Sequence, residues 1–397
     1  MNMNKKIIII LAIVIIIVIV IAGLYWFYSN KPASERPGII SALFPSAGEQ
    51  QIQGLPTPGG GGGLPGGIQV EKTLTQLTQN AVSGAGAAST TVRYIEKSTG
   101  NIYEIEPNGQ NRNRLSNVTI LKTFESFWSV DANKLILRYF EEGAYPSVKT
   151  FSASLTATGT STATTTLQGI FLPGSTTAVA ISLAEDKIFY FIPTGEGIAG
   201  ITADFGNKKQ SNILNIPFSE FNINWPSKNI ITLLTKPSAT AEGILYSLDP
   251  KTGDFEKIIG GVNGLTALMS PDGARMIYSQ SRNSGIEIKI FNLKDKTSSG
   301  FSLTTLPEKC VWSKIDKNIL YCAVPNDLPT GDYPDSWYQG LISFNDSVWQ
   351  INLSTGETNV LINETKSDVI NLFLSKDENY LVFTNKKDNT LWSLKIK

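Results

Sequence analysis

The sequence predicts an all-β fold, a β-propeller of four-stranded blades, because one hairpin motif recurs along the chain at intervals that suit one copy per blade. The clearest copy, Leu268 to Tyr278, reads as an apolar strand, the turn Ser270-Pro271-Asp272-Gly273 and a second apolar strand. Pro271 presets φ for the turn, while Asp272 and Gly273 supply a side-chain acceptor and a permissive backbone. Three of the five intervals between successive copies are close to one blade of about 40 to 45 residues. The further copies are centred at Ser129, Ser182, Trp225-Pro226, Ser313 and Ser375.

The composition excludes several classes of function. The 397 residues contain 34 Lys and Arg and 34 Asp and Glu, so the formal net charge is zero and the basic excess typical of nucleic-acid binders is missing. The chain has no His, which excludes Ser-His-Asp and Cys-His catalysis and the commonest zinc ligand. Two Cys are too few for a thiolate metal site. We therefore expect no nucleic-acid partner and no cofactor, and we assign no metal-ligating residue.

An uncharged apolar run from Ile7 to Tyr28 predicts a membrane-spanning helix. At about 1.5 Å per residue this run reaches about 33 Å, enough to cross the hydrocarbon core of a bilayer. Lys5 and Lys6 precede it, so the positive-inside rule places the N-terminus in the cytoplasm and the rest of the chain outside. A cleaved signal peptide is the alternative, less favoured because the run exceeds the usual h-region and lacks a clean cleavage pattern. Residues 1–28 are thus expected to be a cytoplasmic tip and a single-pass anchor.

A linker is expected at residues 29–67, which are rich in Pro and include the glycine run from Gly59 to Gly63. Such a composition buries too little apolar surface to fold by itself. The anchor would then be joined flexibly to a propeller at residues 68–397.

The two ends of the propeller segment are expected to complete each other. The last hairpin is followed by one strand, at 390–395, whereas the first blade lacks an inner strand before its strands at 92–95 and 102–105. We expect Gln69 to Leu74 to add the outer strand to the last blade, and Ala81 to Ala88 to be the inner strand of the first. Joining the ends in this way removes open sheet edges. The hairpins and this N-terminal blade together give seven blades, with six as the alternative.

The turn at Ser270-Pro271-Asp272-Gly273 resembles that of the TolB-like and broader WD40-like propeller repeats. The resemblance extends over roughly residues 70 to 397. Within it, Ser313-Lys314-Ile315-Asp316 and Ser375-Lys376-Asp377 are degraded copies, and the Trp-Asp dipeptides of WD40 repeats are missing. The resemblance implies a binding platform in the cell envelope, commonly for protein partners.

Cys310 and Cys322 lie on the two strands of one predicted hairpin, at equal distances from a turn centred near Asp316. Antiparallel pairing about that centre places the two Cys opposite each other, with Trp312 facing Leu320. Cross-strand Cys residues reach disulfide spacing, and the expected location is outside the reducing cytosol. We expect a disulfide; the alternative is two buried free thiols that act as small hydrophobes.

The long loop from Pro325 to Asp346 is the candidate binding site. Its aromatic faces and carboxylates suit stacking on a sugar ring, gripping a peptide or holding a calcium ion. It joins the second and third strands of a blade, so it should project from the face where the connections between blades also emerge. In the alternative, Tyr333, Trp337 and Tyr338 fold back onto the protein. The candidate residues are Asp327, Asp332, Tyr333, Asp335, Trp337 and Tyr338.

Paired carboxylates for glycoside cleavage are not expected in this chain. Asp131, Asp272, Asp316 and Asp377 recur at equivalent turn positions in different blades, so turn chemistry accounts for them. We assign no catalytic residue and expect a protein-binding or assembly module of the cell envelope, not an enzyme. The alternatives are a propeller that binds or degrades an envelope polysaccharide, and a structural surface protein without a ligand.

Overall fold

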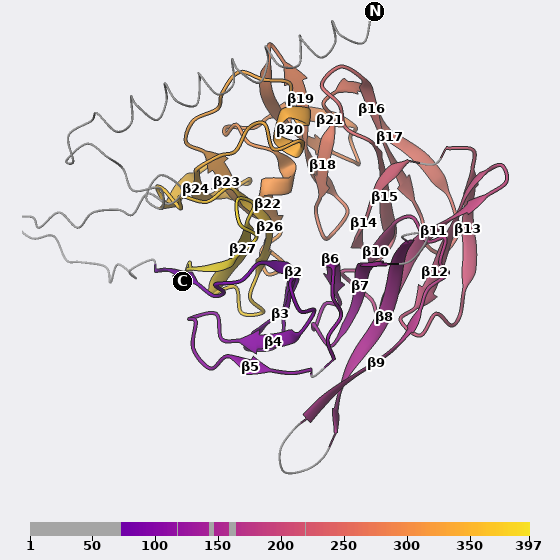
Figure 1. Ribbon diagram of the computed structural model, residues 1–397. Coiled ribbons are helices and arrows are strands. Elements are labelled where there is room, and N and C mark those ends of the chain that lie inside the picture. The colour runs from indigo at the N-terminus through magenta and orange to yellow at the C-terminus, as the bar shows by residue number, and fades with distance from the viewer. Residues whose placement is uncertain (1–72, 117, 143–146, 159–163, 219) are drawn as a thin grey trace, which may run out of the picture. The chain divides into compact units, whose positions relative to one another are not determined.

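The computed structural model describes residues 73–116, 118–142, 147–158, 164–218 and 220–397. In this part of the chain, seven four-stranded sheets are arranged in a ring (Figure 1). The strands nearest the centre are β2, β6, β10, β14, β18, β22 and β26. Neighbouring strands within each of these sheets pair antiparallel. The predicted β-propeller is therefore confirmed with seven blades, and the alternative of six is wrong.

Six of the blades are built from consecutive strands. Blade 1 consists of β2 (Val82–Ala87), β3 (Val92–Glu96), β4 (Ile102–Ile105) and β5 (Asn113–Arg114). Blade 2 consists of β6 (Thr123–Trp128), β7 (Lys134–Glu141), β8 (Ser147–Thr158) and β9 (Thr164–Phe171). Blade 3 consists of β10 (Val179–Ile181), β11 (Lys187–Thr194), β12 (Gly197–Asp204) and β13 (Ser211–Ile216).

The next three blades follow the same order. Blade 4 consists of β14 (Phe221–Ser227), β15 (Ile230–Thr235), β16 (Glu242–Leu248) and β17 (Phe255–Asn263). Blade 5 consists of β18 (Thr266–Met269), β19 (Arg275–Arg282), β20 (Gly285–Asn292) and β21 (Thr297–Gly300). Blade 6 consists of β22 (Cys310–Trp312), β23 (Ile319–Pro325), β24 (Asp346–Asn352) and β25 (Thr358–Ile362). Two short helices also belong to this region, η2 (Pro307–Lys309) and α2 (Asp335–Tyr338).

Blade 7 joins the two ends of the propeller. It contains β26 (Val369–Leu374), β27 (Tyr380–Asn385) and β28 (Leu391–Lys395), and β1 (Leu74–Gln76) pairs with β28 as its outer strand. The predicted closure is confirmed, and β2 is the predicted inner strand of blade 1. The closing strand begins at Leu74, where the predicted strand ended; residues 69–72 lie outside the described part.

The repeated turn motif is built by hydrogen bonds between side chain and backbone. In blade 5, Ser270 Oγ donates to Asp272 Oδ1 at 2.6 Å, Ala274 N donates to the same oxygen at 3.1 Å, and Arg275 N donates to Ser270 Oγ at 3.0 Å. Gly273 completes the turn with φ of +69°, a conformation that L side chains rarely adopt. Blades 2 and 7 repeat the Ser–Asp pair with Ser129–Asp131 and Ser375–Asp377.

Blade 6 departs from this turn pattern. There Ser313 Oγ donates to Glu378 Oε2 at 2.7 Å, and Lys314 N donates to Glu378 Oε1 at 2.7 Å. Glu378 belongs to the turn of blade 7 and is buried. The Asp316 side chain instead accepts a hydrogen bond from Asn318 N at 2.9 Å. A carboxylate from the next blade therefore takes the place that Asp occupies elsewhere.

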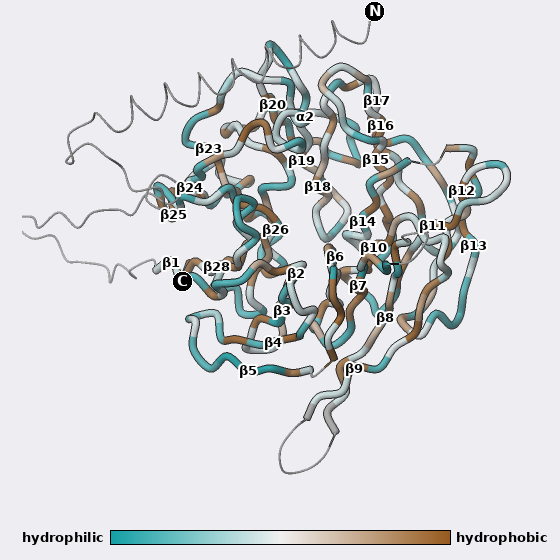
Figure 2. Tube along the Cα trace, viewed as in Figure 1, coloured by the Kyte–Doolittle hydropathy of each residue, from teal (hydrophilic) through white to brown (hydrophobic). Residues whose placement is uncertain are grey.

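The hydrophobic core lies between neighbouring blades. One buried cluster joins blades 1 and 2 through Ile95, Ile102, Trp128 and Leu135, and comparable clusters occupy the other blade interfaces. A Cβ added at Gly86 of β2 would meet Trp128 Cβ at 2.7 Å, which explains why the inner strand of blade 1 is made of small residues. Figure 2 shows apolar colour along β6 and β7 and hydrophilic colour along the outer strand β5.

The propeller has two faces, defined by the loops that each carries. The interblade face bears the loops between second and third strands and the connections between blades. The described residues of this face are 77–81, 97–101, 115–116, 118–122, 142, 172–178, 195–196, 217–218, 220, 236–241, 264–265, 283–284, 301–309, 326–345, 363–368 and 386–390. The opposite face, called the hairpin face, bears the inner-hairpin turns 88–91, 129–133, 182–186, 228–229, 270–274, 313–318 and 375–379.

The expected anchor at residues 7–28 and the expected linker at residues 29–67 lie outside the described residues. Among the residues that are described, none belongs to a helix long and apolar enough to cross a membrane.

Candidate functional site

The long loop 326–345 lies across the interblade face and is tied to three other blades. Gly331 N donates to Ser284 O of blade 5 at 3.0 Å, and Ala239 N of blade 4 donates to Asp335 Oδ2 at 2.6 Å. On the other side, Lys386 Nζ of blade 7 donates to Trp337 O at 2.6 Å. The loop therefore holds neighbouring blades together as well as joining β23 to β24.

Two of the predicted aromatic binding residues are buried. Tyr333 is 1% exposed and Trp337 is 3% exposed, and both stack with Phe344 at centroid distances of 6.2 and 6.3 Å. Tyr333 also donates its hydroxyl hydrogen to Pro329 O at 2.6 Å. The alternative in which the aromatic side chains fold back therefore describes Tyr333 and Trp337, whose ring faces are unavailable to a ligand. Burial of these large apolar rings against the blade is favourable, and it drives this packing.

Tyr338 and Asp335 remain at the surface of the helix α2 but have protein partners. Tyr338 is 41% exposed, and its hydroxyl group hydrogen-bonds to Glu308 Oε1. Glu308 Oε2 accepts a second hydrogen bond, at 2.9 Å, from Thr266 Oγ1. Burial raises the pKa of Glu308, and burial together with the neighbouring Glu308 carboxylate raises the pKa of Tyr338 above its ordinary value. This end of the loop is thus a hydrogen-bonded surface and not a free aromatic platform.

Asp327 and Asp332 are exposed on the same loop. They do not converge with Asp335 on one ligand position, because no group of three or more Asp, Glu or Cys side chains in the described residues is placed to hold a metal ion. The six candidate residues thus divide into a buried pair, a hydrogen-bonded pair and an exposed pair.

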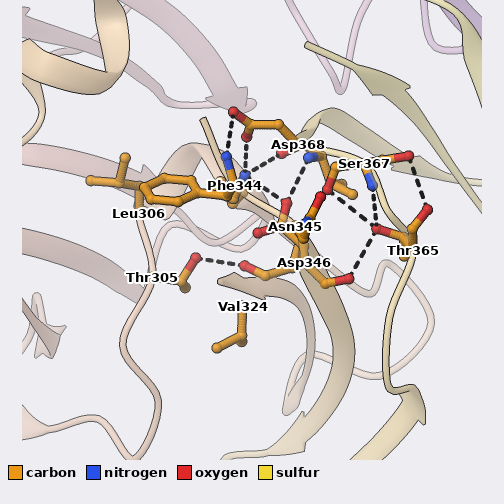
Figure 3. Close-up of polar contacts among 12 residues, drawn as sticks. Thr305, Leu306, Val324, Phe344, Asn345, Asp346, Thr365, Ser367 and Asp368 are labelled. Carbon is orange, nitrogen blue, oxygen red and sulfur yellow. Dashed lines mark hydrogen bonds and ion pairs between the residues drawn. The ribbon is translucent and has the colours of Figure 1, made fainter. Parts of the chain in front are cut away.

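Beneath the loop lies an ion network that joins three connections of the interblade face (Figure 3). Lys309 Nζ lies 2.8 Å from Asp346 Oδ2 and 2.7 Å from Asp368 Oδ1, and it donates to Val369 O at 2.9 Å. The side chains of Lys309, Asp346 and Asp368 have no exposed area. Since a buried charge is costly without a partner, this network fixes the ends of η2, β24 and β26 relative to one another.

The two carboxyl groups of the network have different surroundings. Asp368 Oδ2 accepts hydrogen bonds from Trp337 Nε1 at 2.9 Å, Ser343 Oγ at 3.2 Å and Phe344 N at 3.2 Å. Asp346 Oδ2 accepts from Val369 N at 2.6 Å, whereas Asp346 Oδ1 is buried without a hydrogen-bond partner. Burial raises the pKa of Asp346 against the opposing effect of Lys309.

The backbone around Asp346 is held by the neighbouring connection at 363–368. Thr365 N and Thr365 Oγ1 both donate to Asp346 O, at 2.8 and 2.9 Å, and Asp346 N donates to Ser367 O at 3.0 Å (Figure 3). Sequence reasoning missed the whole network, because its members come from connections far apart in the chain. The available signal was a lysine, Lys309, placed directly before an apolar strand.

Cys310 follows Lys309 and lies opposite Cys322, with Trp312 opposite Leu320, as the predicted register requires. The two Sγ atoms lie 2.11 Å apart and form a disulfide between β22 and β23. Blade 6 therefore carries a covalent link beside the ion network.

The hairpin face carries an open pocket of about 460 Å³ at the turns of blades 1, 2 and 7. Arg93, Glu104, Asp131 and Lys376 supply the charged groups of its lining. Arg93 Nε lies 3.5 Å from Glu104 Oε2, and Arg93 also donates to Ala132 O at 3.1 Å. Burial acts to raise the pKa of Asp131, but hydrogen bonds from Ser129 and Asn133 hold it below its ordinary value.

Comparison with known proteins identifies the fold. The chain matches no protein-family model and no curated protein. Among solved structures it is similar to an oligogalacturonate lyase from Vibrio parahaemolyticus, with a TM-score of 0.58 and 10% identity over 83% of this chain and 95% of that chain. It is also similar to an oligogalacturonate lyase in complex with manganese, with a TM-score of 0.54 and 10% identity over 83% of this chain and 94% of that one. TolB from Acinetobacter baumannii gives a TM-score of 0.43 and 10% identity over 78% of this chain and 64% of TolB.

At 10% identity, the similarity to the lyases shows a shared propeller fold. The chain has no His, and within the described residues no group of three or more Asp, Glu or Cys side chains is placed to hold a metal ion. We therefore assign no metal site in this part of the chain.

Proposed function

We propose that this chain is a membrane-anchored, extracytoplasmic β-propeller that binds a protein partner of the cell envelope through its interblade face. The anchor rests on the uncharged run at residues 7–28 and on the two lysines before it. The disulfide of blade 6 fits an oxidising compartment outside the cytosol. In this role the propeller is a binding or assembly module and not an enzyme.

The distribution of exposed apolar side chains carries the proposal. Leu341 is 74% exposed, Leu121 and Phe218 are 60% exposed, and Phe171 is 57% exposed, all on or beside the interblade face. On the hairpin face, exposed large apolar residues among those described are Leu183 and Ile315. Exposed apolar groups gathered on one face favour contact with a protein surface, where their burial stabilises the complex. Further members on the interblade side are Val118, Phe140, Ile170 and Tyr338.

Crosslinking and mass spectrometry on intact cells test the partner. The full chain would be compared with Leu341→Asp and with the matched control Ile315→Asp, which places the same charge on the opposite face at a site 67% exposed. We expect one envelope protein to be captured by the wild type and the control and lost from Leu341→Asp. Loss of the captured protein from Ile315→Asp alone would contradict the choice of face. Equal capture by the wild type and both variants would contradict protein binding through the interblade face.

The location has a separate test. Membrane fractions would be digested and searched for peptides that include residues 7–28, and intact cells would be treated with a protease. We expect the uncleaved N-terminal segment in the membrane fraction and loss of the propeller when protease is added outside. A soluble chain that starts after residue 28 would contradict the anchor, and protection of the propeller in intact cells would contradict its orientation.

A second candidate function is binding or cleavage of an acidic envelope polysaccharide, and the charged side chains in the pocket of the hairpin face favour it. Lys376 lines that pocket and supplies a positive charge for a sugar carboxylate, whereas Arg93 is paired there with Glu104. The fold neighbours named oligogalacturonate lyases act, by that name, on an acidic oligosaccharide. A screen of uronic-acid oligosaccharides with the full chain and with Lys376→Ala tests this candidate. Binding or turnover that is lost in the variant would favour it over protein binding.

A further inference from the structure

Lys309, Asp346 and Asp368 bring one amine and two carboxyl groups together out of reach of water. Both ion-pair distances are below 3 Å, and all three side chains have no exposed area. The rings of Trp337 and Phe344 each lie with their centroids 5.2 Å from Lys309 Nζ. An amine and a carboxyl group form an amide bond with the loss of one molecule of water. The fold holds these two groups close together in an apolar surrounding.

The hydrogen bonds assign different roles to the two carboxyl groups. Asp368 accepts from Trp337 Nε1, Ser343 Oγ and Phe344 N, a set of donors that suits a carboxylate. Asp346 Oδ1 is buried without a partner, and an unpartnered buried oxygen favours the neutral carboxylic acid, which loses less hydration. A neutral acid is open to attack at its Cγ, whereas a carboxylate repels a nucleophile. Asp368 is thus suited to act as the base and Asp346 as the acid that is attacked.

We propose that Lys309 and Asp346 are joined by an intramolecular amide bond formed without any other protein. The Lys309 ammonium gives a proton to the Asp368 carboxylate, and the free amine attacks Cγ of Asp346. As the C–N bond forms and the C–OH bond breaks, Asp368 gives its proton to the departing hydroxyl group and takes the surplus proton from nitrogen. One water leaves, and Asp368 ends protonated. No oxidant, reductant or further reactant is needed.

The fold favours both the formation and the survival of this bond. Lys309 ends η2 and Asp346 begins β24, and the hydrogen bonds of Thr365 and Ser367 hold the Asp346 backbone in place. Groups held in attack geometry react with effective concentrations far above those in solution. Trp337 and Phe344 cover the reacting atoms, so water needed for the reverse reaction is excluded. With Cys310 already linked to Cys322, two consecutive residues would anchor the start of β22 covalently.

Peptide mapping of the full chain tests the bond directly. The chain would be purified from cells under denaturing conditions, reduced, alkylated and digested with trypsin, which does not cleave after an acylated lysine. Reduction is essential because the disulfide joins the same two peptides. We expect peptide 297–314 to remain attached to peptide 318–366, at a mass lower by one water than the sum of the two. Asp368 lies in the separate peptide 367–376, so fragmentation also identifies the acid that was attacked.

The outcomes distinguish the bond from a simple ion pair. Free peptide 297–309 in the wild type, without the linked product, would overturn the proposal, and a link to peptide 367–376 would overturn the assignment of Asp346. Asp346→Asn is the matched control, because an amide side chain gives the same linked product by losing ammonia. Asp346→Ala should abolish the link, and Asp368→Asn should sharply reduce the linked fraction. The wild-type result decides the matter even if a variant fails to fold.

Discussion

Replacing Trp337 with alanine should destabilise the propeller much more than replacing its neighbour Tyr338. Trp337 is 3% exposed and stacks with Phe344, so truncation leaves a large cavity that costs about 3 to 5 kcal/mol. The lost hydrogen bond from Trp337 Nε1 to Asp368 moves the expected cost toward the upper end of that range. Tyr338 is 41% exposed, and the loss of its contact with Glu308 should cost about 1 to 2 kcal/mol.

Urea unfolding of the full chain in detergent, followed by far-ultraviolet circular dichroism, measures both variants without relying on tryptophan fluorescence. Because the two residues are adjacent in α2, the pair controls for any general effect of alanine in this helix. A Trp337→Ala variant no less stable than Tyr338→Ala would refute the packing of the loop against the blade. Loss of partner capture by Trp337→Ala at unchanged stability would instead make Trp337 a binding residue.

Three further predictions concern the rest of the propeller. Cys310→Ala combined with Cys322→Ala should lower the free energy of unfolding by about 3 kcal/mol at most, since the disulfide closes a sequence separation of 12 residues. A reductant that destabilises the wild type and the double variant equally would contradict this. Burial acts to raise the pKa of Asp272, but hydrogen bonds from Ser270 and from Ala274 N hold that pKa below its ordinary value. The ionised Asp272 therefore stabilises the fold above the unfolded-state pKa, and this stabilisation is lost as pH falls through the folded-state pKa. Asp272→Asn should therefore lose less stability than the wild type between about pH 6 and about pH 3, and equal pH slopes would count against the turn hydrogen bonds. Glu378→Ala should lower the free energy of unfolding by about 1 to 3 kcal/mol, because Ser313 Oγ and Lys314 N lose their acceptor. Glu378→Gln should lower it less, and equal melting curves for the two variants would refute this role.

The blades could be predicted from the sequence because each is specified locally. The turn at Ser270 and Asp272 is built from residues within six positions of one another, so its copies are visible as a repeated pattern. The register of Cys310 and Cys322 follows from counting along a single hairpin. The closing strand was expected because an unpaired sheet edge is costly, although the starting residue could not be fixed by that reasoning.

The candidate site could not be predicted in the same way. Lys309, Asp346 and Asp368 meet through connections from different blades, and no local pattern marks their approach. Loop aromatic residues read equally well as a binding surface and as packing, and the choice depends on whether a neighbouring blade offers an apolar surface. For Trp337 it does, together with the acceptor Asp368, whereas Tyr338 stays 41% exposed. The burial of a loop side chain depends on residues far away in the chain, and the sequence alone does not show which residues these are.

The pairing of β1 with β28 has a consequence for the order in which the protein folds during synthesis. Leu74 pairs with Leu394, so the first described strand leaves the ribosome long before its partner exists. Until β28 appears, the ring stays open, with an unpaired edge at blade 7 and the apolar surface between blades 7 and 1 uncovered. Contacts so distant in sequence form slowly, because the chain entropy of the closed loop must be lost before the pairing stabilises it. Ring closure is therefore expected to be the last step of folding and the one most exposed to aggregation.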